Sequence, residues 1–285
     1  MKPFLVVDSN YIAHRIMYKM GSFSYQEKLT GVIFGFLRTI SELYDRFSPK
    51  DMIFCWDSTK SWRKIAFPEY KANRNKDYSE EELKVRNAAY YQFNELQDDI
   101  LPRIGFANIF SQPGVEADDL IAKVVLNQTY DKHIIISSDN DLYQLLALAD
   151  IFLVDKKILF TKKDFDELYG IPPAAWLNVK ALTGDASDNI PGVKGVGIKT
   201  AIKYLKNRFN INADLRKEIE NQTDQITLNT QLMRIPHRRT LPIQINKSTF
   251  NLSEFEKVCL ENGFQFFLRK EQYFKWEKMF NELNT

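Results

Sequence analysis

Three short hydrophobic runs, each closed by an aspartate, constrain the fold of this chain more than any other feature. They are Phe4–Asp8, Met52–Asp57 and His133–Asp139. Helix-length stretches separate them, with apolar residues three and four apart, as at Val32, Phe36 and Ile40. Alternating strands and helices predict an α/β fold in which parallel strands are covered by helices. Because parallel strands end at one edge of their sheet, we expect the three aspartates to converge there.

The pattern changes twice along the chain. A charged, polar stretch from Arg74 to Asp99 indicates an insertion or a mobile crossover. After Asp164 the spacing is helical, with Pro172 and Pro173 opening one helix and Gly184 ending it. We therefore predict a core over residues 1–160 and a helical part over residues 161–285.

Composition excludes several classes of protein. Two cysteines and three histidines among 285 residues are too few and too scattered for a disulfide framework or a zinc site. No run approaches 18 apolar residues, and Asp8 interrupts the apolar start too early for a signal peptide. These features predict a soluble, non-secreted protein of the reducing cytoplasm.

Acidic side chains gather in three further motifs, Gly114–Asp119, Ser138–Asp141 and Gly184–Asn189. Taken singly, each has a structural explanation, because acids stabilise the first turn of a helix and favour turns. Together with the strand-end aspartates they form a set of nine: Asp8, Asp57, Glu116, Asp118, Asp119, Asp139, Asp141, Asp185 and Asp188.

So many carboxylates cannot share one cleft in ionised form unless divalent cations lie among them. Oxygen ligands without His or Cys favour Mg²⁺, with Mn²⁺ as a substitute, over zinc. Two such ions roughly 3.5 to 4 Å apart suit phosphodiester cleavage.

A glycine-rich turn follows the third acidic motif. Its glycines and adjoining polar residues are Gly192, Lys194, Gly195, Gly197, Lys199 and Thr200. Glycine lets a backbone approach a ligand closely, and the free amides of a following helix can hold a phosphate. The spacing does not fit a nucleotide P-loop. Five cations and no acid between Lys194 and Arg208 favour a grip on a DNA backbone over a simple turn between packed helices.

Aromatic residues alternate with cations between Ser61 and Arg74, just after the second strand. Aromatic rings stack on bases while cations neutralise phosphates, so the segment favours single-strand binding, with Lys64 among its cations. A half-buried amphipathic loop is the alternative.

Six motifs in order resemble the 5'-nuclease family, which includes flap endonucleases, bacteriophage 5'-exonucleases and the nuclease domain of bacterial DNA polymerase I. They are Val7–Asn10, Trp56–Ser58, Tyr70–Arg74, Gly114–Asp119, Ser137–Leu142 and Gly184–Gly197. The resemblance runs from Asp8 to about Arg208. It implies a PIN-like core, a helical arch at about residues 75–100, and a helix-three-turn-helix motif at about residues 173–208, which often binds potassium.

The resemblance also implies site roles. The nine acids correspond to the family's metal-site residues, Tyr70, Lys71 and Arg74 to the base of the arch, and Arg63 to a further basic position. It implies hydrolysis by a metal-activated water, with Lys71 and either Arg63 or Arg74 stabilising the transition state, to give a 5'-phosphate and a 3'-hydroxyl.

The expected enzyme is a monomeric 5'-flap endonuclease and 5'-3' exonuclease acting on branched DNA and RNA primers in replication or repair, in the cytoplasm of a cell or of a virus's host. Two alternatives stay open. One is a ribonuclease of the wider PIN class, against which the basic glycine turn argues. The other is a non-catalytic protein that binds DNA junctions, against which the complete acidic set argues.

Overall fold

A six-stranded sheet forms the centre of the computed structural model, which describes residues 2–74, 78–127 and 132–284. The strands are β1 (Phe4–Asp8), β4 (Asp51–Cys55), β5 (Ile109–Phe110), β6 (His133–Ile136), β7 (Asp150–Leu153) and β8 (Ile158–Phe160). Their order is β5-β4-β1-β6-β7-β8, and only β8 runs antiparallel to its neighbour. A separate hairpin pairs β2 (Ser24–Tyr25) with β3 (Lys28–Leu29).

The three runs that defined the predicted sheet are neighbours in it. In register, Phe4 of β1 lies opposite Asp51 of β4 and His133 of β6. Side chains along β1 alternate between the two faces of the sheet, with Leu5 and Val7 in one core and Phe4 and Val6 in the other. The predicted α/β fold with a parallel centre is confirmed.

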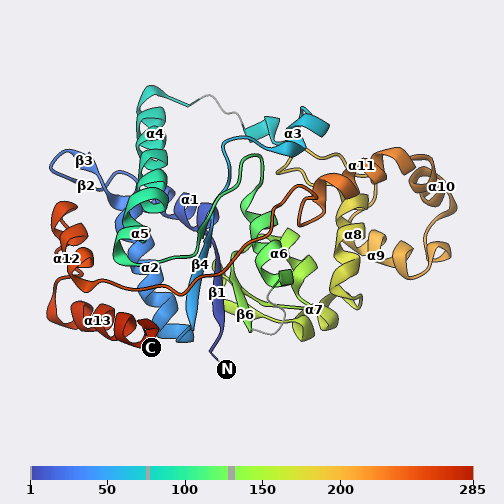
Figure 1. Cartoon of the computed structure of the whole chain (residues 1–285). Coiled ribbons are helices and arrows are strands. Elements are labelled where there is room, and N and C mark those ends of the chain that lie inside the picture. Colours follow the sequence, from blue (N-terminus) through green and yellow to red (C-terminus); the bar gives the residue numbers. More distant parts are fainter. Residues whose placement is uncertain (1, 75–77, 128–131, 285) are drawn as a thin grey trace.

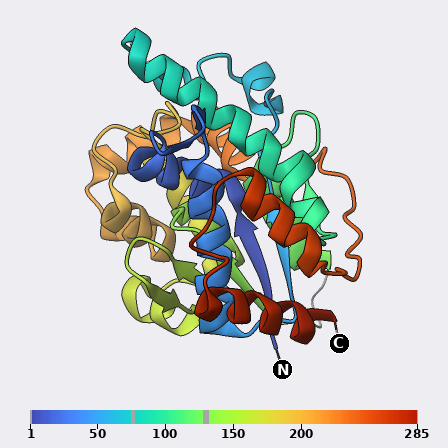
Figure 2. The same cartoon turned by 90° about the vertical axis from the view of Figure 1, so that its left-hand side faces the viewer.

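Helices cover both faces (Figures 1 and 2). The first core is closed by α1 (Ser9–Met20), α2 (Gly31–Phe47), α4 (Glu80–Glu95), the π-helical η2 (Leu96–Ile100), α5 (Leu101–Ile104), α12 (Leu252–Glu261) and α13 (Lys270–Asn284). The second is closed by α6 (Ala117–Asn127), η3 (Asn140–Leu145), α7 (Lys162–Tyr169), η4 (Pro173–Ala175), α8 (Trp176–Thr183), α9 (Ile198–Lys206), α10 (Ala213–Asn221) and α11 (Thr223–Met233). The remaining helices of the described residues are short: α3 (Trp62–Ala66), η1 (Ala72–Arg74) and η5 (Arg208–Asn210).

The last helices return to the first core. An extended segment leaves α11 and crosses the molecule to α12 (Figure 1). There Phe255 stacks on Trp276 with ring centroids 4.2 Å apart, and both are buried in the core that α2 covers. The sequence placed all residues after 160 in one helical part. Within that range, α12 and α13 pack in the first core, whereas α8 and α9 pack in the second core on the other face of the sheet.

The start of the predicted arch, residues 75–77, lies outside the described residues. The rest of that range is the helical run α4, η2 and α5, which begins at a capping box formed by Ser79 and Glu82. Among the described helices, none has both the length and the apolar composition needed to cross a membrane.

Candidate active site

Three aspartates meet where the central strands end. Asp8 ends β1 and caps α1 by accepting a hydrogen bond from the backbone N–H of Tyr11 at 3.0 Å, and its other oxygen accepts one from Ser137 Oγ at 2.8 Å. Asp57 follows β4 and accepts one from the N–H of Ala117 at 2.8 Å, at the start of α6. Asp139 follows β6 and caps η3 through the N–H of Asp141 at 2.8 Å.

We name a first group the sheet-edge carboxylates: Asp8, Asp57, Asp118, Asp139 and Asp141. Desolvation, reinforced by the charge of Asp57, raises the pKa of Asp8 to about 7. Desolvation and the charge of Asp139 raise the pKa of Asp141 to about 7 as well. Desolvation also raises the pKa values of Asp57, Asp118 and Asp139. Burial and mutual repulsion therefore disfavour the ionised form of these carboxyl groups in the absence of added cations.

A second group has its own cations, and we name Glu116, Asp185 and Asp188 the lysine-paired carboxylates. Glu116 accepts hydrogen bonds from Ser61 Oγ at 2.7 Å, Tyr70 Oη at 2.9 Å and Lys71 Nζ at 2.8 Å. Although burial opposes ionisation, Lys71 and Arg63 hold the pKa of Glu116 at about 2.

The segment Glu69–Arg74 is tied directly to the loop that carries Asp185 and Asp188. Tyr70 Oη lies 3.0 Å from Asp188 Oδ2, and Arg74 Nη2 lies 2.5 Å from Asp188 Oδ1. The backbone N–H of Lys71 donates to the carbonyl of Asp188 at 2.8 Å, and Lys71 adopts a left-handed φ of 57°. A non-glycine residue in that conformation is held by its surroundings, here by this junction.

Lys71 itself remains a cation. Burial would lower the pKa of its ammonium group, but the charges of Glu116 and Asp188 raise it instead. It is thus poised to donate hydrogen bonds and positive charge at neutral pH.

Arg63 and Asp119 form a buried pair behind the site. Arg63 Nη1 and Nη2 donate to the two oxygens of Asp119 at 2.6 and 2.8 Å, while Arg63 is 5% and Asp119 0% exposed. The N–H groups of Glu116 and His237 also donate to Asp119, so its four lone-pair positions are used. This arrangement argues against Asp119 as a metal ligand and against contact of Arg63 with a substrate. The buried ion pair of Arg63 and Asp119 therefore stabilises the position of α6.

Lys180 on α8 is a site residue that the sequence did not single out. Its Nζ lies 2.9 Å from Asp141 Oδ1, donates to Asn140 Oδ1 at 3.0 Å, and also pairs with Asp185. Only 5% of Lys180 is exposed. The one available signal is a lone cation in the otherwise apolar end of a helix, since lysine is rarely buried without a partner.

Four of these carboxylates line a cavity of about 10 Å³, which leaves room for about one water molecule or ion: Glu116, Asp118, Asp141 and Asp188. Among the described residues, no three His, Cys, Asp or Glu side chains already form a metal-binding set. Lysine ammonium groups lie between the carboxylates instead, Lys71 next to Glu116 and Lys180 next to both Asp141 and Asp185. The donors nevertheless fit a hard divalent cation, because they are carboxylates whose negative charge is undercompensated.

The segment predicted to bind the DNA backbone forms a compact turn between α8 and α9. A side chain at Gly192 would meet the carbonyl oxygen of Thr183 at 2.1 Å, and Gly195 has a φ of 80°, so both positions require glycine. Gly197 faces open space at the start of α9, where backbone amides are free. Lys194 and Lys199 are exposed. Of the remaining predicted DNA-binding residues, Thr200 is half-buried, Lys64 is exposed and Tyr70 is buried.

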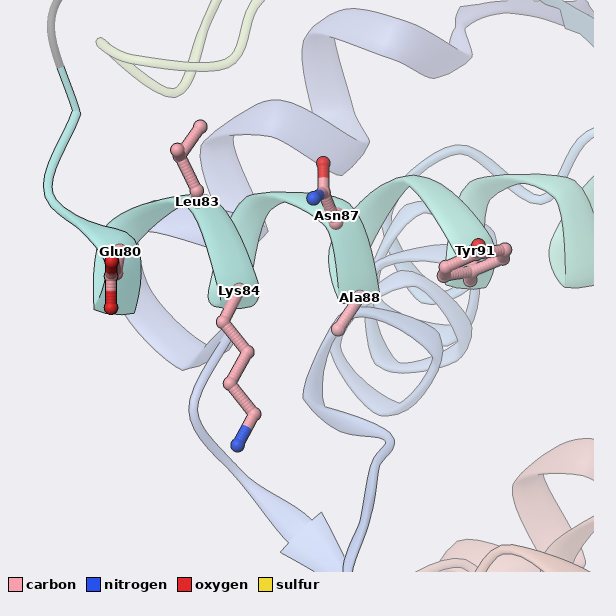
Figure 3. A pocket seen from close by; sticks show the side chains of 6 residues that line it. All are labelled: Glu80, Leu83, Lys84, Asn87, Ala88 and Tyr91. Atoms are coloured by element: carbon pink, nitrogen blue, oxygen red, sulfur yellow. The ribbon is translucent and has the colours of Figure 1, made fainter.

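The helix α4 carries an open hollow of about 510 Å³ along one face. Its lining side chains are Glu80, Leu83, Lys84, Asn87, Ala88 and Tyr91 (Figure 3). Leu83 and Tyr91 are exposed, at 44% and 72%. The hollow therefore combines an aromatic ring and apolar surface with one cation, Lys84, and one carboxylate, Glu80, and it lies in the range predicted to form the arch.

Comparisons with known proteins agree on one family. A model of the 5'-3' exonuclease N-terminal resolvase-like domain matches residues 3–170, and one of the 5'-3' exonuclease C-terminal SAM fold matches residues 171–257. A 5'-3' exonuclease of Buchnera aphidicola from Schizaphis graminum is 35% identical over 269 residues, covering 91% of this chain and 87% of that protein. The thermostable DNA polymerase I of Thermus filiformis is 29% identical over 262 residues, which are 86% of this chain and 30% of the polymerase.

Solved structures share the fold. The T5 D15 protein, co-crystallised with metal ions, has a TM-score of 0.70 at 19% identity, with 99% of each chain covered. Flap endonuclease-1 from Methanococcus jannaschii has a TM-score of 0.61 at 12% identity, covering 99% of this chain and 93% of that one.

Proposed function

The chain belongs to the 5'-3' exonuclease family and is a 5'-nuclease, and from this premise we propose that it is a metal-dependent flap endonuclease and 5'-3' exonuclease. It would cut near a junction of single strand and duplex and leave a 5'-phosphate and a 3'-hydroxyl. The observation that carries the proposal is that the sheet-edge carboxylates Asp118 and Asp141 line one small cavity together with Glu116 and Asp188, the two carboxylates that pair with the cation Lys71.

The sheet-edge carboxylates, together with Glu116, Asp185 and Asp188, would hold Mg²⁺, with Mn²⁺ as a substitute. Bound divalent ions would supply charge stabilisation and activation of water for phosphodiester hydrolysis. Asp119 is left out of this set because its lone pairs are all used by hydrogen bonds.

Lys71 and Arg74 would act on the substrate. Both side chains lie at the rim of the acidic loop, and Arg74 is exposed while it contacts Asp188. A charged donor aimed at a phosphate stabilises the negative charge that develops during cleavage. Arg63 would act only indirectly, by fixing Asp119 and α6.

Binding to DNA would not depend on sequence. The amides at Gly197 and the exposed Lys194 and Lys199 would contact the duplex backbone, with potassium at the same turn. The hollow on α4 would face the 5' arm, of DNA or of an RNA primer. The proposal includes a monomeric enzyme that works in the cytoplasm, where replicating DNA is available.

A 5'-end-labelled DNA flap tests the proposal. With Mg²⁺ we expect release of a short oligonucleotide cut near the junction, and with EDTA no release. Lys71→Ala should lower the single-turnover cleavage rate by roughly 10²- to 10³-fold. Lys278→Ala, a change of an exposed lysine on α13, is the matched control and should cleave normally.

Two outcomes would contradict the proposal. Tight binding of the flap without cleavage at any Mg²⁺ concentration would indicate a junction-binding protein. Preferential cleavage of single-stranded RNA without a duplex would indicate a ribonuclease.

A further inference from the structure

A second basic surface surrounds Trp62, apart from the glycine turn. Its five cations are exposed, and we name them the Trp62 basic surface: Lys60, Lys64, Arg234, Arg238 and Arg239. Lys60 and Lys64 flank Trp62 in the sequence, whereas the three arginines come from the segment that leaves α11. The segment after α11 is visible in Figure 1, where it crosses the core on its way to α12.

Specific contacts hold the two segments together. The guanidinium carbon of Arg239 lies 4.2 Å from the centre of the Trp62 ring, and the backbone N–H of Trp62 donates to the carbonyl of Gly114 at 2.9 Å. Beneath them, buried Arg63 donates to the carbonyls of Leu232 at 2.6 Å and Arg234 at 3.3 Å. The surface is therefore built on the same buried pair that supports α6.

Arg238 also lies close to this junction. Burial and the charges of Arg63, Arg238 and Arg239 together lower the pKa of His237, whose N–H is bound to Asp119. Positive charge is thus concentrated over a short stretch of chain around His237.

The surface begins at the wall of the acidic cavity. Leu232, Met233 and Ile235 line that cavity together with Glu116 and Asp118. Arg234 lies between Met233 and Ile235 in the sequence, and Arg238 comes three residues after Ile235. A chain of phosphates that leaves the acidic cavity in this direction would meet the arginines next.

The cations of this surface are not neutralised by the protein. Within residues 2–74, 78–127 and 132–284, none of the five forms an ion pair with a carboxylate. Clustered unpaired cations beside an anionic site raise the local concentration of a polyanion and speed its association. Arginine guanidinium groups in particular match phosphate oxygens with paired hydrogen bonds.

We propose that the Trp62 basic surface binds the phosphodiester backbone of the nucleic acid next to the bond that is cut, as a contact separate from the turn between α8 and α9. The inference rests on the proposed nuclease function and adds a binding surface formed partly by residues beyond about Arg208, where the sequence resemblance ended. Its partner is a nucleic-acid backbone, recognised by charge and not by base.

The test measures binding without cleavage. The dissociation constant of a fluorescently labelled 5'-flap DNA is determined in EDTA at salt concentrations between roughly 50 and 200 mM. For the double variant Arg238→Ala/Arg239→Ala, loss of two phosphate contacts should reduce the slope of log Kd against log salt by about 2 and weaken binding about tenfold at the lower salt.

Two further variants make the result specific. Arg38→Ala/Lys278→Ala removes the same charge from α2 and α13 and should bind like the wild type. Arg238→Lys/Arg239→Lys keeps the charge and should keep most of the slope, which separates charge from folding. An unchanged slope together with a Kd within twofold of the wild type for the alanine variant would overturn the proposal, as would an equal loss in the α2 and α13 control.

Because binding is measured in EDTA, the two proposals fail separately. A wild-type protein that binds the flap but never cuts it refutes the nuclease mechanism and leaves the surface to be judged by its salt slope. Unchanged binding by the alanine variant refutes the surface even if the wild type cleaves normally.

Discussion

The two groups of carboxylates at this site are compensated in opposite ways. The sheet-edge carboxylates crowd together at the strand ends, where desolvation and mutual repulsion raise the pKa values of Asp8 and Asp141 to about 7. The lysine-paired carboxylates have cations and hydroxyl groups within hydrogen-bond distance, and the pKa of Glu116 is held at about 2.

The difference shows where the protein leaves room for a cation from solution. A carboxylate that already contacts a lysine gains less from a metal ion than one that faces only other carboxylates. Asp141 at the sheet edge already contacts Lys180, so Asp8, Asp118 and Asp139 are the carboxylates that depend most on added ions, whereas the protein itself completes the junction of Tyr70, Lys71 and Asp188.

The largest expected effect comes from removing one sheet-edge charge. Asp139→Asn should reduce Mg²⁺-dependent flap cleavage by roughly 10³-fold or more, because it weakens the binding of ions that stabilise the transition state. The asparagine oxygen can still cap Asp141, so the fold should persist. Without metal the variant should be at least as stable to urea as the wild type, and a large loss of stability would break the comparison.

A smaller effect is expected behind the site. Arg63→Met leaves Asp119 buried without its cation and should lower the free energy of unfolding by about 3 kcal/mol. Adding Asp119→Leu should recover part of the loss, because the second change removes the unpaired charge. Urea unfolding of both variants measures this, and equal stability of the single variant and the wild type would show that the pair is not a support.

Divalent ions should stabilise the fold through the sheet edge. At a Mg²⁺ concentration about 100 times its dissociation constant, the free energy of unfolding should rise by about 2.7 kcal/mol. Thermal unfolding with and without Mg²⁺ measures the increase, and Asp139→Asn should reduce it while Arg38→Ala, an exposed change on α2, should not. The same increase in both variants would place the ions elsewhere.

The smallest effect is the pH dependence of the metal-free protein. A carboxyl whose pKa is raised on folding stabilises the fold at low pH, so the contribution of Asp8 and Asp141 should be lost as pH rises from about 4 to about 7. Glu116, whose pKa is lowered, contributes above about pH 4.5 and loses its contribution as pH falls toward 2.

Urea unfolding across this range checks both signs. In Asp139→Asn the decline between pH 4 and 7 should shrink by about 1 kcal/mol, since Asp139 raises the pKa values of its neighbours. Glu116→Gln should flatten only the acid side. A decline that is unchanged in Asp139→Asn would show that repulsion at the sheet edge is not its cause.

Much of the site could be predicted because its signals are local. Asp8, Asp57 and Asp139 each follow a hydrophobic run, and because these strands run parallel their ends meet at one edge of the sheet. The glycines at residues 192–197 likewise predict a tight turn, and Gly192 and Gly195 occupy positions that a side chain would disturb. Strands, turns and helix starts can be predicted because each depends on a few neighbouring residues.

The roles of Asp119, Arg63 and Lys180 could not be predicted in this way. In the sequence Asp119 looks like its neighbour Asp118, one position along the same helix start. Only the packing of Arg63 against α6 assigns the lone pairs of Asp119 to a buried pair and leaves Asp118 among the sheet-edge carboxylates. Lys180 reaches Asp141 across 39 residues of sequence, through the packing of α8 against η3.

By itself, then, the sequence determined the parallel sheet, the edge where the acids gather and the turn proposed for the DNA backbone, because hydrophobic period and glycine placement act over a few residues. Tertiary structure alone decided which acids are neutralised by the protein and which are left for added cations. The physical reason is that charge compensation depends on distance in space, and Lys71, Arg63 and Lys180 reach their partners only after distant segments have packed together.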